Sequence, residues 1–253
     1  MQFVEMGNMS GKTLMLLPGT CCDWQMNFST VIDRLKEKYH LICVNYDGFD
    51  GTDTVFSDMI TVTEKIEKYI VENHNGRING ALGSSLGGSF VAQLMIRENI
   101  HMDHGIFGSS DLDQSGVLSA KLKSAMVVPL LTSFTKSDKK KRKAKQKFIE
   151  LFEMDEKTAD MFLDSFTRFS TESIKNQFYT DLITCLKDDN HVEGTTPHFI
   201  YANKMGEKYK KRYLKYFRDP DIREFDMQHE QWLFGGPRYS EPVLEAIDEF
   251  MES

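Results

Sequence analysis

The sequence contains few cysteines and few prolines, lacks a long apolar run, and carries no excess of positive charge. Its four cysteines have neither metal-ligand nor C-x-x-C spacing, so we expect free thiols in a reducing cytoplasm and no cysteine-held metal. No apolar run approaches the length of a membrane span, and the first five residues lack the basic and apolar regions of a secretory signal. The net charge of −7 argues against nonspecific binding to nucleic acid.

The length and the composition allow a sizeable core. The chain has 253 residues, of which 40% are hydrophobic and six are prolines, which is ordinary for a soluble globular protein. A chain of this length forms one large α/β domain or two small ones. Whether it forms a homo-oligomer is left open by the sequence.

Short apolar runs alternate with helical patterns through most of the chain. Unbroken runs of this length are typical of parallel strands buried on both faces, and the amphipathic segments between them are typical of connecting helices. The sequence therefore predicts an α/β fold with a mostly parallel central sheet and helices on both faces. Strands are expected at residues 2–6, 13–17, 40–45, 77–82, 105–108, 197–202 and 221–225, and helices at residues 24–38, 57–74, 207–217 and 241–251.

The alternation stops between residues 114 and 194, where the pattern is helical and rich in Phe and Met. Because strands resume afterwards, this segment is predicted to be an insertion, and residues 1–113 and 195–253 are predicted to form the core. Its apolar residues either pack the insertion onto the sheet or also roof a pocket for an apolar acyl or alkyl group. Its basic run at residues 136–147, with eight lysines or arginines and one aspartate, is either a solvated helix face or a docking site for an acidic partner or anionic substrate.

Residues 83–88 read Gly-Ser-Ser-Leu-Gly-Gly and follow a predicted strand. With Ser85 at the centre, glycine stands at both flanking positions of G-x-S-x-G, the pattern of a serine on a sharp turn between a strand and a helix. Gly83 and Gly87 allow the chain to reverse there without a Cβ clash. Ser85 would then stand where helix N–H groups and the helix dipole favour a developing negative charge. Ordinary turns rich in Gly and Ser share this pattern, so the rest of the chain must decide.

Four features decide in favour of catalysis when they are taken together and in order. They are Pro18-Gly19 after a buried strand, the loop at residues 47–52, the turn around Ser85, and a lone histidine, His229, between the last strand and the last helix. On these features the sequence resembles the α/β-hydrolase superfamily over nearly its whole length. The resemblance implies a serine hydrolase with a helical cap at residues 114–194, a small-molecule acyl substrate, and neither a metal nor an organic cofactor. Serine in place of aspartate at position 85 disfavours the haloalkane dehalogenase and epoxide hydrolase branches of this superfamily.

His229 is the histidine expected to act as the base for Ser85. A serine hydroxyl is a poor nucleophile at neutral pH, and an imidazole has a pKa suited to taking its proton. Of the seven histidines, only His229 follows the carboxyl end of a predicted strand, where ligands meet an open α/β sheet. The others lie at the opposite end of the sheet, in a helix-to-strand loop or in the insertion: His40, His74, His101, His104, His191 and His198.

The acid that would hold His229 has three candidates. The resemblance places it shortly after the strand that precedes the histidine strand, where this sequence has Met205, which cannot serve. Glu207, two residues further along, is the first choice if the loop is longer. Asp111 is the alternative acid, because some family members carry it after the preceding strand, and Asp113 is the third candidate.

An oxyanion hole would complete such a site with two backbone donors. One is the N–H of Leu86, after the nucleophile, and by resemblance the other belongs to Thr20, with Cys21 as second choice. The sequence then predicts a cytoplasmic, carboxylesterase-like serine hydrolase that cleaves a small ester, thioester or amide through an acyl-enzyme. Because a fold does not fix a function, a non-catalytic binding or scaffold protein of the same fold is the alternative.

Overall fold

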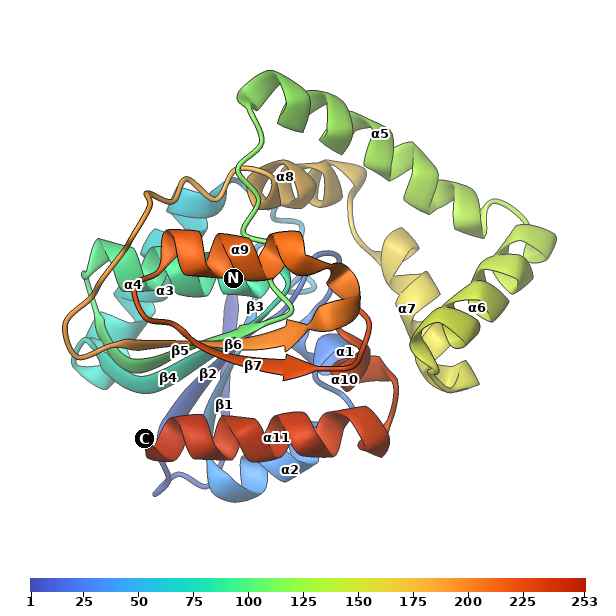
Figure 1. Ribbon diagram of the computed structural model, residues 1–253. Helices are drawn as coiled ribbons and strands as arrows, with labels where there is room; N and C mark the ends of the chain where they lie inside the picture. Colours follow the sequence, from blue (N-terminus) through green and yellow to red (C-terminus); the bar gives the residue numbers. More distant parts are fainter.

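A seven-stranded sheet forms the centre of the computed structural model, which describes residues 1–253 (Figure 1). Its strands are β1 (Gln2–Gly7), β2 (Thr13–Leu17), β3 (His40–Asn45), β4 (Arg77–Ser84), β5 (His101–Gly108), β6 (Thr196–Ala202) and β7 (Asp221–Phe225). They lie in the order β1-β3-β2-β4-β5-β6-β7. β1 is antiparallel to β3, and every other neighbouring pair is parallel. The predicted fold class is therefore confirmed.

The central strands are buried because they are built from the unbroken apolar runs seen in the sequence. Residues 14–17 of β2 are fully buried, and residues 41–44 of β3 are as well. The parallel register brings the carboxyl ends of β2, β4, β5 and β6 to one edge of the sheet. The loops that leave these ends meet at this edge, which is where an open α/β sheet binds its ligands.

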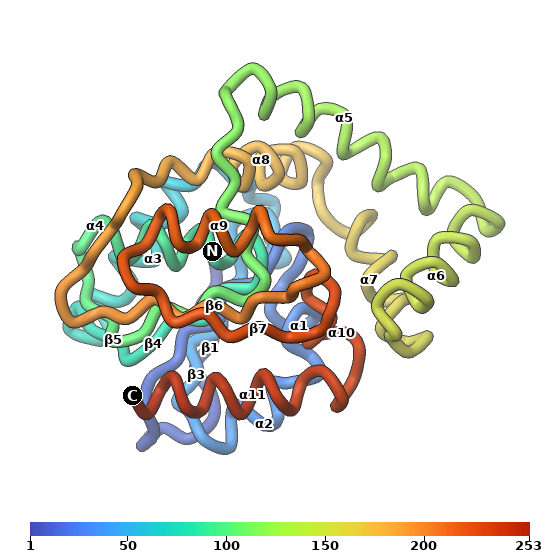
Figure 2. Tube along the Cα trace, viewed as in Figure 1, coloured from blue at the N-terminus to red at the C-terminus, as the bar shows by residue number.

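Helices cover both faces of this sheet (Figures 1 and 2). The helices of the core are α1 (Trp24–Asn27), α2 (Ile32–Lys38), α3 (Met59–His74), α4 (Leu86–Arg97), α9 (Glu207–Tyr216), α10 (Gln231–Phe234) and α11 (Pro237–Glu252), and a short 3-10 turn, η1 (Asn203–Met205), follows β6. One buried cluster joins α3, α4 and α9 to one face of the sheet. A second cluster joins α1, α2, α10 and α11 to the opposite face.

The helix predicted at residues 24–38 is two short helices, α1 and α2. In the break, the Ser29 hydroxyl donates to the Met26 carbonyl at 3.0 Å, and the Thr30 hydroxyl donates to the Leu233 carbonyl at 2.6 Å. A serine side chain that bonds to nearby backbone in this way competes with the hydrogen bonds of a helix, whereas the Thr30 contact ties the break to α10.

Four helices lie between β5 and β6, where the sequence predicts an insertion. They are α5 (Val117–Thr135), α6 (Asp138–Phe152), α7 (Glu156–Arg168) and α8 (Thr171–Asp181). In Figure 1, α5 runs outward from the sheet, α6 and α7 form the far end, and α8 returns to the core. The insertion is tied to the core by an ion pair between Arg168 and Asp23 at 2.6 Å and by a hydrogen bond from the Asn176 amide to the Phe56 carbonyl at 2.8 Å.

α5 is long and apolar enough to cross a membrane, judged by length and composition only. The sequence prediction that no apolar run approaches the length of a membrane span therefore fails for α5. Its only charged residues, Lys121 and Lys123, interrupt the apolar sequence near its start. Only 11% of the most apolar 18-residue stretch of α5 is buried within the protein. The helix is thus apolar and yet largely exposed.

Candidate active site

The turn between β4 and α4 has the geometry of a nucleophile elbow. Ser85 has φ 48° and ψ −111°, a conformation that a residue with a Cβ adopts only under strain. A Cβ on Gly83 would collide with the backbone of Gly87, and a Cβ on Gly87 would collide with the Leu17 carbonyl. The Ser85 N–H donates to the Gly108 carbonyl at 2.9 Å, which holds the turn against β5. Both glycines are required because α4 passes directly over the strands.

His229 lies beside Ser85, where the sequence predicts it. Its Nε2 is 3.2 Å from the Ser85 Oγ, within hydrogen-bond reach for proton transfer. His229 lies in the loop between β7 and α10, so the pairing is formed by the fold and not by proximity in sequence. About a third of the His229 side chain is exposed, whereas Ser85 is buried, so solvent meets the pair on the His229 side.

Asp111 is the predicted acid that the structure brings to His229. Its Oδ1 lies 4.0 Å from Nδ1 of His229, the ring nitrogen that does not face Ser85. Burial raises the pKa of Asp111, and the charges of His229 and Arg212 oppose that rise. The distance is that of an ion pair and is longer than a hydrogen bond.

Glu207, the first choice from the sequence, is not brought to His229. It begins α9, and it makes neither a hydrogen bond with His229 nor an ion pair within 4.0 Å. The reason is that α9 supports the loop after β5 with two other residues. Arg212 Nη1 donates to the Asp111 carbonyl at 2.8 Å, and the Tyr213 hydroxyl donates to the Ser110 carbonyl at 2.6 Å.

Asp113, the third candidate, faces Arg212 instead of His229. Its Oδ1 is 3.5 Å from Arg212 Nη2 and also accepts the Gln114 N–H at 2.8 Å. Of the three candidates, the structure therefore brings only Asp111 within 4.0 Å of the imidazole.

Glu230, next to His229 in the sequence, also lies at the site. Its Oε2 lies 3.8 Å from His229 Nε2, and its Oε1 accepts a hydrogen bond from the Ser84 hydroxyl. Glu230 has φ 55°, and this left-handed conformation lets the adjacent side chains of His229 and Glu230 both reach the elbow. No sequence signal indicates it, because glutamate seldom adopts that conformation.

Solved structures of known proteins share this architecture over almost their full lengths. An esterase from Exiguobacterium antarcticum matches with a TM-score of 0.74 at 15% identity, covering 99% of this chain and 95% of that one. An alpha/beta hydrolase family protein from Desulfitobacterium hafniense matches with a TM-score of 0.73 at 17% identity, covering 97% and 99%. This chain has the α/β-hydrolase fold. An enol-lactonase from Burkholderia xenovorans LB400 also matches, with a TM-score of 0.69 at 11% identity, covering 100% and 96%.

The sequence matches no protein-family model and no curated protein. At identities of 17% or less the likeness is one of fold, so the roles of individual residues rest on their geometry in this chain. In this α/β-hydrolase fold, Ser85 follows β4, Asp111 follows β5 and His229 follows β7, and all three loops leave the same edge of the sheet.

Leu86 and Thr20 carry the two backbone N–H groups that the sequence predicts for an oxyanion hole. Leu86 begins α4, and first-turn N–H groups have no partner within their helix. The Thr20 N–H donates no hydrogen bond, whereas the Cys21 N–H donates to Gln177 Oε1 of α8 at 2.8 Å. Thr20 is therefore the free donor of the two. Burial raises the pKa of Cys21 to about 12, so its thiol stays neutral.

Asp181, at the end of α8, is a further acid close to the site. Burial, together with the negative charges of Asp111, Asp113 and Glu230, raises its pKa to about 8. At neutral pH most Asp181 side chains are therefore protonated, which limits repulsion among these carboxyl groups. Although these acids gather here, no three ligands are placed to hold a metal ion.

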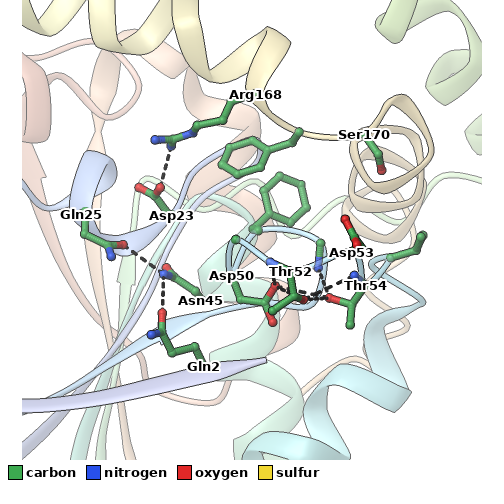
Figure 3. A pocket seen from close by; sticks show the side chains of 15 residues that line it. Gln2, Asp23, Gln25, Asn45, Asp50, Thr52, Asp53, Thr54, Arg168 and Ser170 are labelled. Carbon is green, nitrogen blue, oxygen red and sulfur yellow. Dashed lines mark hydrogen bonds and ion pairs between the residues drawn. The ribbon is translucent and has the colours of Figure 1, made fainter.

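A cavity of about 560 Å³ lies between the loops after β2 and β3 and the connection from α7 to α8 (Figure 3). Neither Ser85 nor His229 lines it, and only three of its fifteen lining residues are hydrophobic. The Asn45 amide in its wall donates to Gln2 at 3.3 Å and to Gln25 at 3.0 Å. The cavity is therefore polar.

The phenylalanines of the insertion pack against one another. The Phe162 ring lies edge-on to Phe148 and to Phe166, with both centroid distances 5.1 Å. Phe49 and Phe169 stand at the polar cavity, with ring centroids 4.5 Å apart. These contacts agree with the interpretation that the phenylalanines of the insertion serve mainly for packing.

Proposed function

We propose that this chain is a serine hydrolase that cleaves a small ester, thioester or amide by acyl transfer. The observation that carries the proposal is the 3.2 Å contact between Ser85 Oγ and His229 Nε2 on a strained turn. Strained backbone at a nucleophile is typical of sites that position a reacting atom. The free N–H of Thr20 and the helix-initiating N–H of Leu86 support the same chemistry.

In the proposed reaction, Ser85 Oγ attacks the substrate carbonyl carbon while His229 Nε2 takes the hydroxyl proton. Asp111 stabilises the imidazolium that forms, and the Leu86 and Thr20 N–H groups donate to the oxyanion. The tetrahedral intermediate collapses when His229 returns the proton to the leaving oxygen, sulfur or nitrogen. Water, deprotonated by His229, then attacks the acyl carbon, and the bond to Ser85 Oγ breaks as His229 returns the proton to that oxygen, which releases the acid product.

The insertion would act as a cap in this reaction. α8 holds the loop that carries Thr20, because Gln177 accepts the neighbouring Cys21 N–H. The Arg168–Asp23 ion pair fastens the other end of the same loop. The position of α7 and α8 therefore supports a role in shaping the acyl site and in keeping the Thr20 donor in place.

Hydrolysis of a panel of p-nitrophenyl esters and acyl thioesters of increasing chain length tests the proposal. The wild type is expected to release product with a burst that matches the enzyme concentration when deacylation is slow. Ser85→Ala should show neither burst nor turnover, whereas Ser57→Ala, at an exposed serine outside the site, should retain both. Equal activity in wild type and Ser85→Ala would contradict the proposed nucleophile.

A non-catalytic binding protein is the second candidate. One observation favours it: the 4.0 Å contact between His229 and Asp111 is longer than the hydrogen bond that usually orients a catalytic imidazole. A non-catalytic binding protein should be well folded, hydrolyse none of the p-nitrophenyl esters or acyl thioesters, and form no covalent intermediate.

A further inference from the structure

α5 presents a stripe of apolar side chains to solvent. Leu118, Leu122, Met126 and Leu130 recur at every fourth position and are between 56% and 84% exposed. Residues four apart lie on one face of a helix, so these side chains form a continuous row. Soluble proteins seldom leave such a row uncovered, and one that is exposed usually marks an interaction surface.

The inner face of α5 is already occupied by the protein. Ala120 and Ser124 are buried, and the helix packs against α6, α7 and α8. The outer row is therefore not needed to hold the insertion together. Lys121 and Lys123 lie among the first turns of α5 and are exposed. With one face packed and two lysines in its length, α5 is suited to lie along an apolar boundary and not to cross one.

Positive charge is concentrated next to this row. Residues 117–147 contain ten lysines or arginines and one aspartate, although the whole chain has a net charge of −7. On α6, Lys141 pairs with Asp164 and Lys145 pairs with Asp160. Six other basic side chains of the run are exposed and make no ion pair: Lys136, Lys139, Lys140, Arg142, Lys143 and Lys147.

α5 and α6 are adjoining parts of the insertion that project from the core (Figures 1 and 2). We propose that the outer face of these two helices, hereafter the docking face, binds a lipid surface that carries anionic headgroups. The apolar row would enter the boundary between headgroups and acyl chains, and the unpaired basic side chains would contact phosphate and carboxylate groups.

Charge complementarity favours an anionic lipid surface over a second copy of this chain. Two copies that met through their docking faces would bring two basic runs together, and these like charges would repel. An anionic lipid surface instead offers negative charge beside an apolar layer, in the arrangement that the docking face presents. Lipid binding by the docking face does not depend on the chemistry at Ser85. Failure of one proposal therefore leaves the other untouched.

Sedimentation with lipid vesicles tests the docking face. The wild type is expected to bind phosphatidylcholine vesicles that contain about one-third phosphatidylserine, to bind pure phosphatidylcholine weakly, and to be released by salt. The pair Leu122→Asp and Met126→Asp should weaken binding by at least about tenfold, because charge replaces side chains that enter the lipid. The pair Lys140→Gln and Lys143→Gln should weaken it by a similar factor.

Matched controls carry the same substitutions elsewhere on the surface. Val71→Asp and Leu214→Asp change apolar residues that are 52% and 58% exposed on α3 and α9. Lys187→Gln and Lys211→Gln change two exposed lysines outside the docking face. All four should leave vesicle binding unchanged. Circular dichroism spectra should match the wild type for every variant, because each altered side chain is exposed.

Two results would overturn the proposal. Wild-type protein that does not bind anionic vesicles is the first, and equal losses in the control variants are the second. In the first case, dimer formation that depends on protein concentration and is abolished by Leu122→Asp would show that a second copy covers α5.

Discussion

The Oδ1 atom of Asp111 lies 4.0 Å from Nδ1 of His229, which is the ring nitrogen that does not contact Ser85. Asp111 follows β5 and His229 follows β7, with β6 between them in the sheet. In the proposed mechanism, this placement would let the Asp111 carboxylate stabilise the imidazolium without approaching Ser85. Asp111, His229 and Ser85 therefore come from three separate loops at one edge of the sheet.

Asp111→Asn should lower kcat by a factor of about 10²–10⁴, because the imidazolium would lose its stabilising charge. Glu207→Gln should leave kcat almost unchanged, since Glu207 does not contact His229. Both are measured with the same p-nitrophenyl ester, and circular dichroism checks the fold. A loss in Glu207→Gln as large as that in Asp111→Asn would show that α9 approaches the site in solution.

Ser85→Gly should unfold at a higher temperature than Ser85→Ala. Both variants lack the hydroxyl, but only glycine relieves the strain of φ 48° and ψ −111°, which is of the order of 1–3 kcal/mol. The greater freedom of glycine in the unfolded chain opposes this by about 0.4–1 kcal/mol, so the net change should favour Ser85→Gly. Equal melting temperatures in calorimetry would mean that the strain relieved at Ser85 is no larger than the opposing effect of glycine, about 0.4–1 kcal/mol.

Gly87→Ala should destabilise the protein by several kcal/mol or prevent folding, because the new Cβ would collide with the Leu17 carbonyl. Gly116→Ala is the matched control, since a Cβ there would meet nothing within 4 Å and φ is −65°. Urea unfolding of both variants measures the difference. Similar midpoints would show that α4 is not packed closely on β2.

Asp181 should make stability depend on pH. Its pKa rises from an ordinary value near 3.8 to about 8 in the folded protein. The folded state therefore keeps a proton that the unfolded state releases, and this contribution, complete below about pH 4, is lost as the pH rises through about 8. Asp181→Asn removes this titration.

Melting temperatures of wild type and Asp181→Asn between pH 5 and pH 9 provide the check. The variant should gain stability relative to wild type as the pH rises, since the wild type must ionise a buried acid and the variant need not. A constant difference across that range would place the pKa of Asp181 near its ordinary value.

The sheet and the elbow were predictable because their signals are short and local. Buried parallel strands such as β2 are unbroken apolar runs. Gly83 and Gly87 identify a turn that has no room for a Cβ at these two positions. His229 followed from the rule that ligands meet the carboxyl ends of parallel strands. Each of these inferences needs only neighbouring residues or the order of the elements.

The acid was not predictable to the same extent, because it depends on contacts between distant segments. Arg212 and Tyr213 of α9 position the loop of Asp111, and nothing in their spacing shows this. Glu230 reaches the site through one left-handed residue, which the sequence does not signal. α5 presents a similar limit: its apolar composition predicts burial, whereas its outer face is exposed.

Covalent labelling with a fluorophosphonate, followed by intact-protein mass spectrometry and peptide mapping, tests most directly whether His229 activates Ser85 as a nucleophile. Wild-type protein should gain one phosphonyl group on Ser85. Ser85→Ala should gain none, and His229→Ala should react more slowly by at least about 10² because the base is missing. Folded wild-type protein that stays unlabelled, or Ser85→Ala that labels as fast as wild type, would contradict the proposed mechanism.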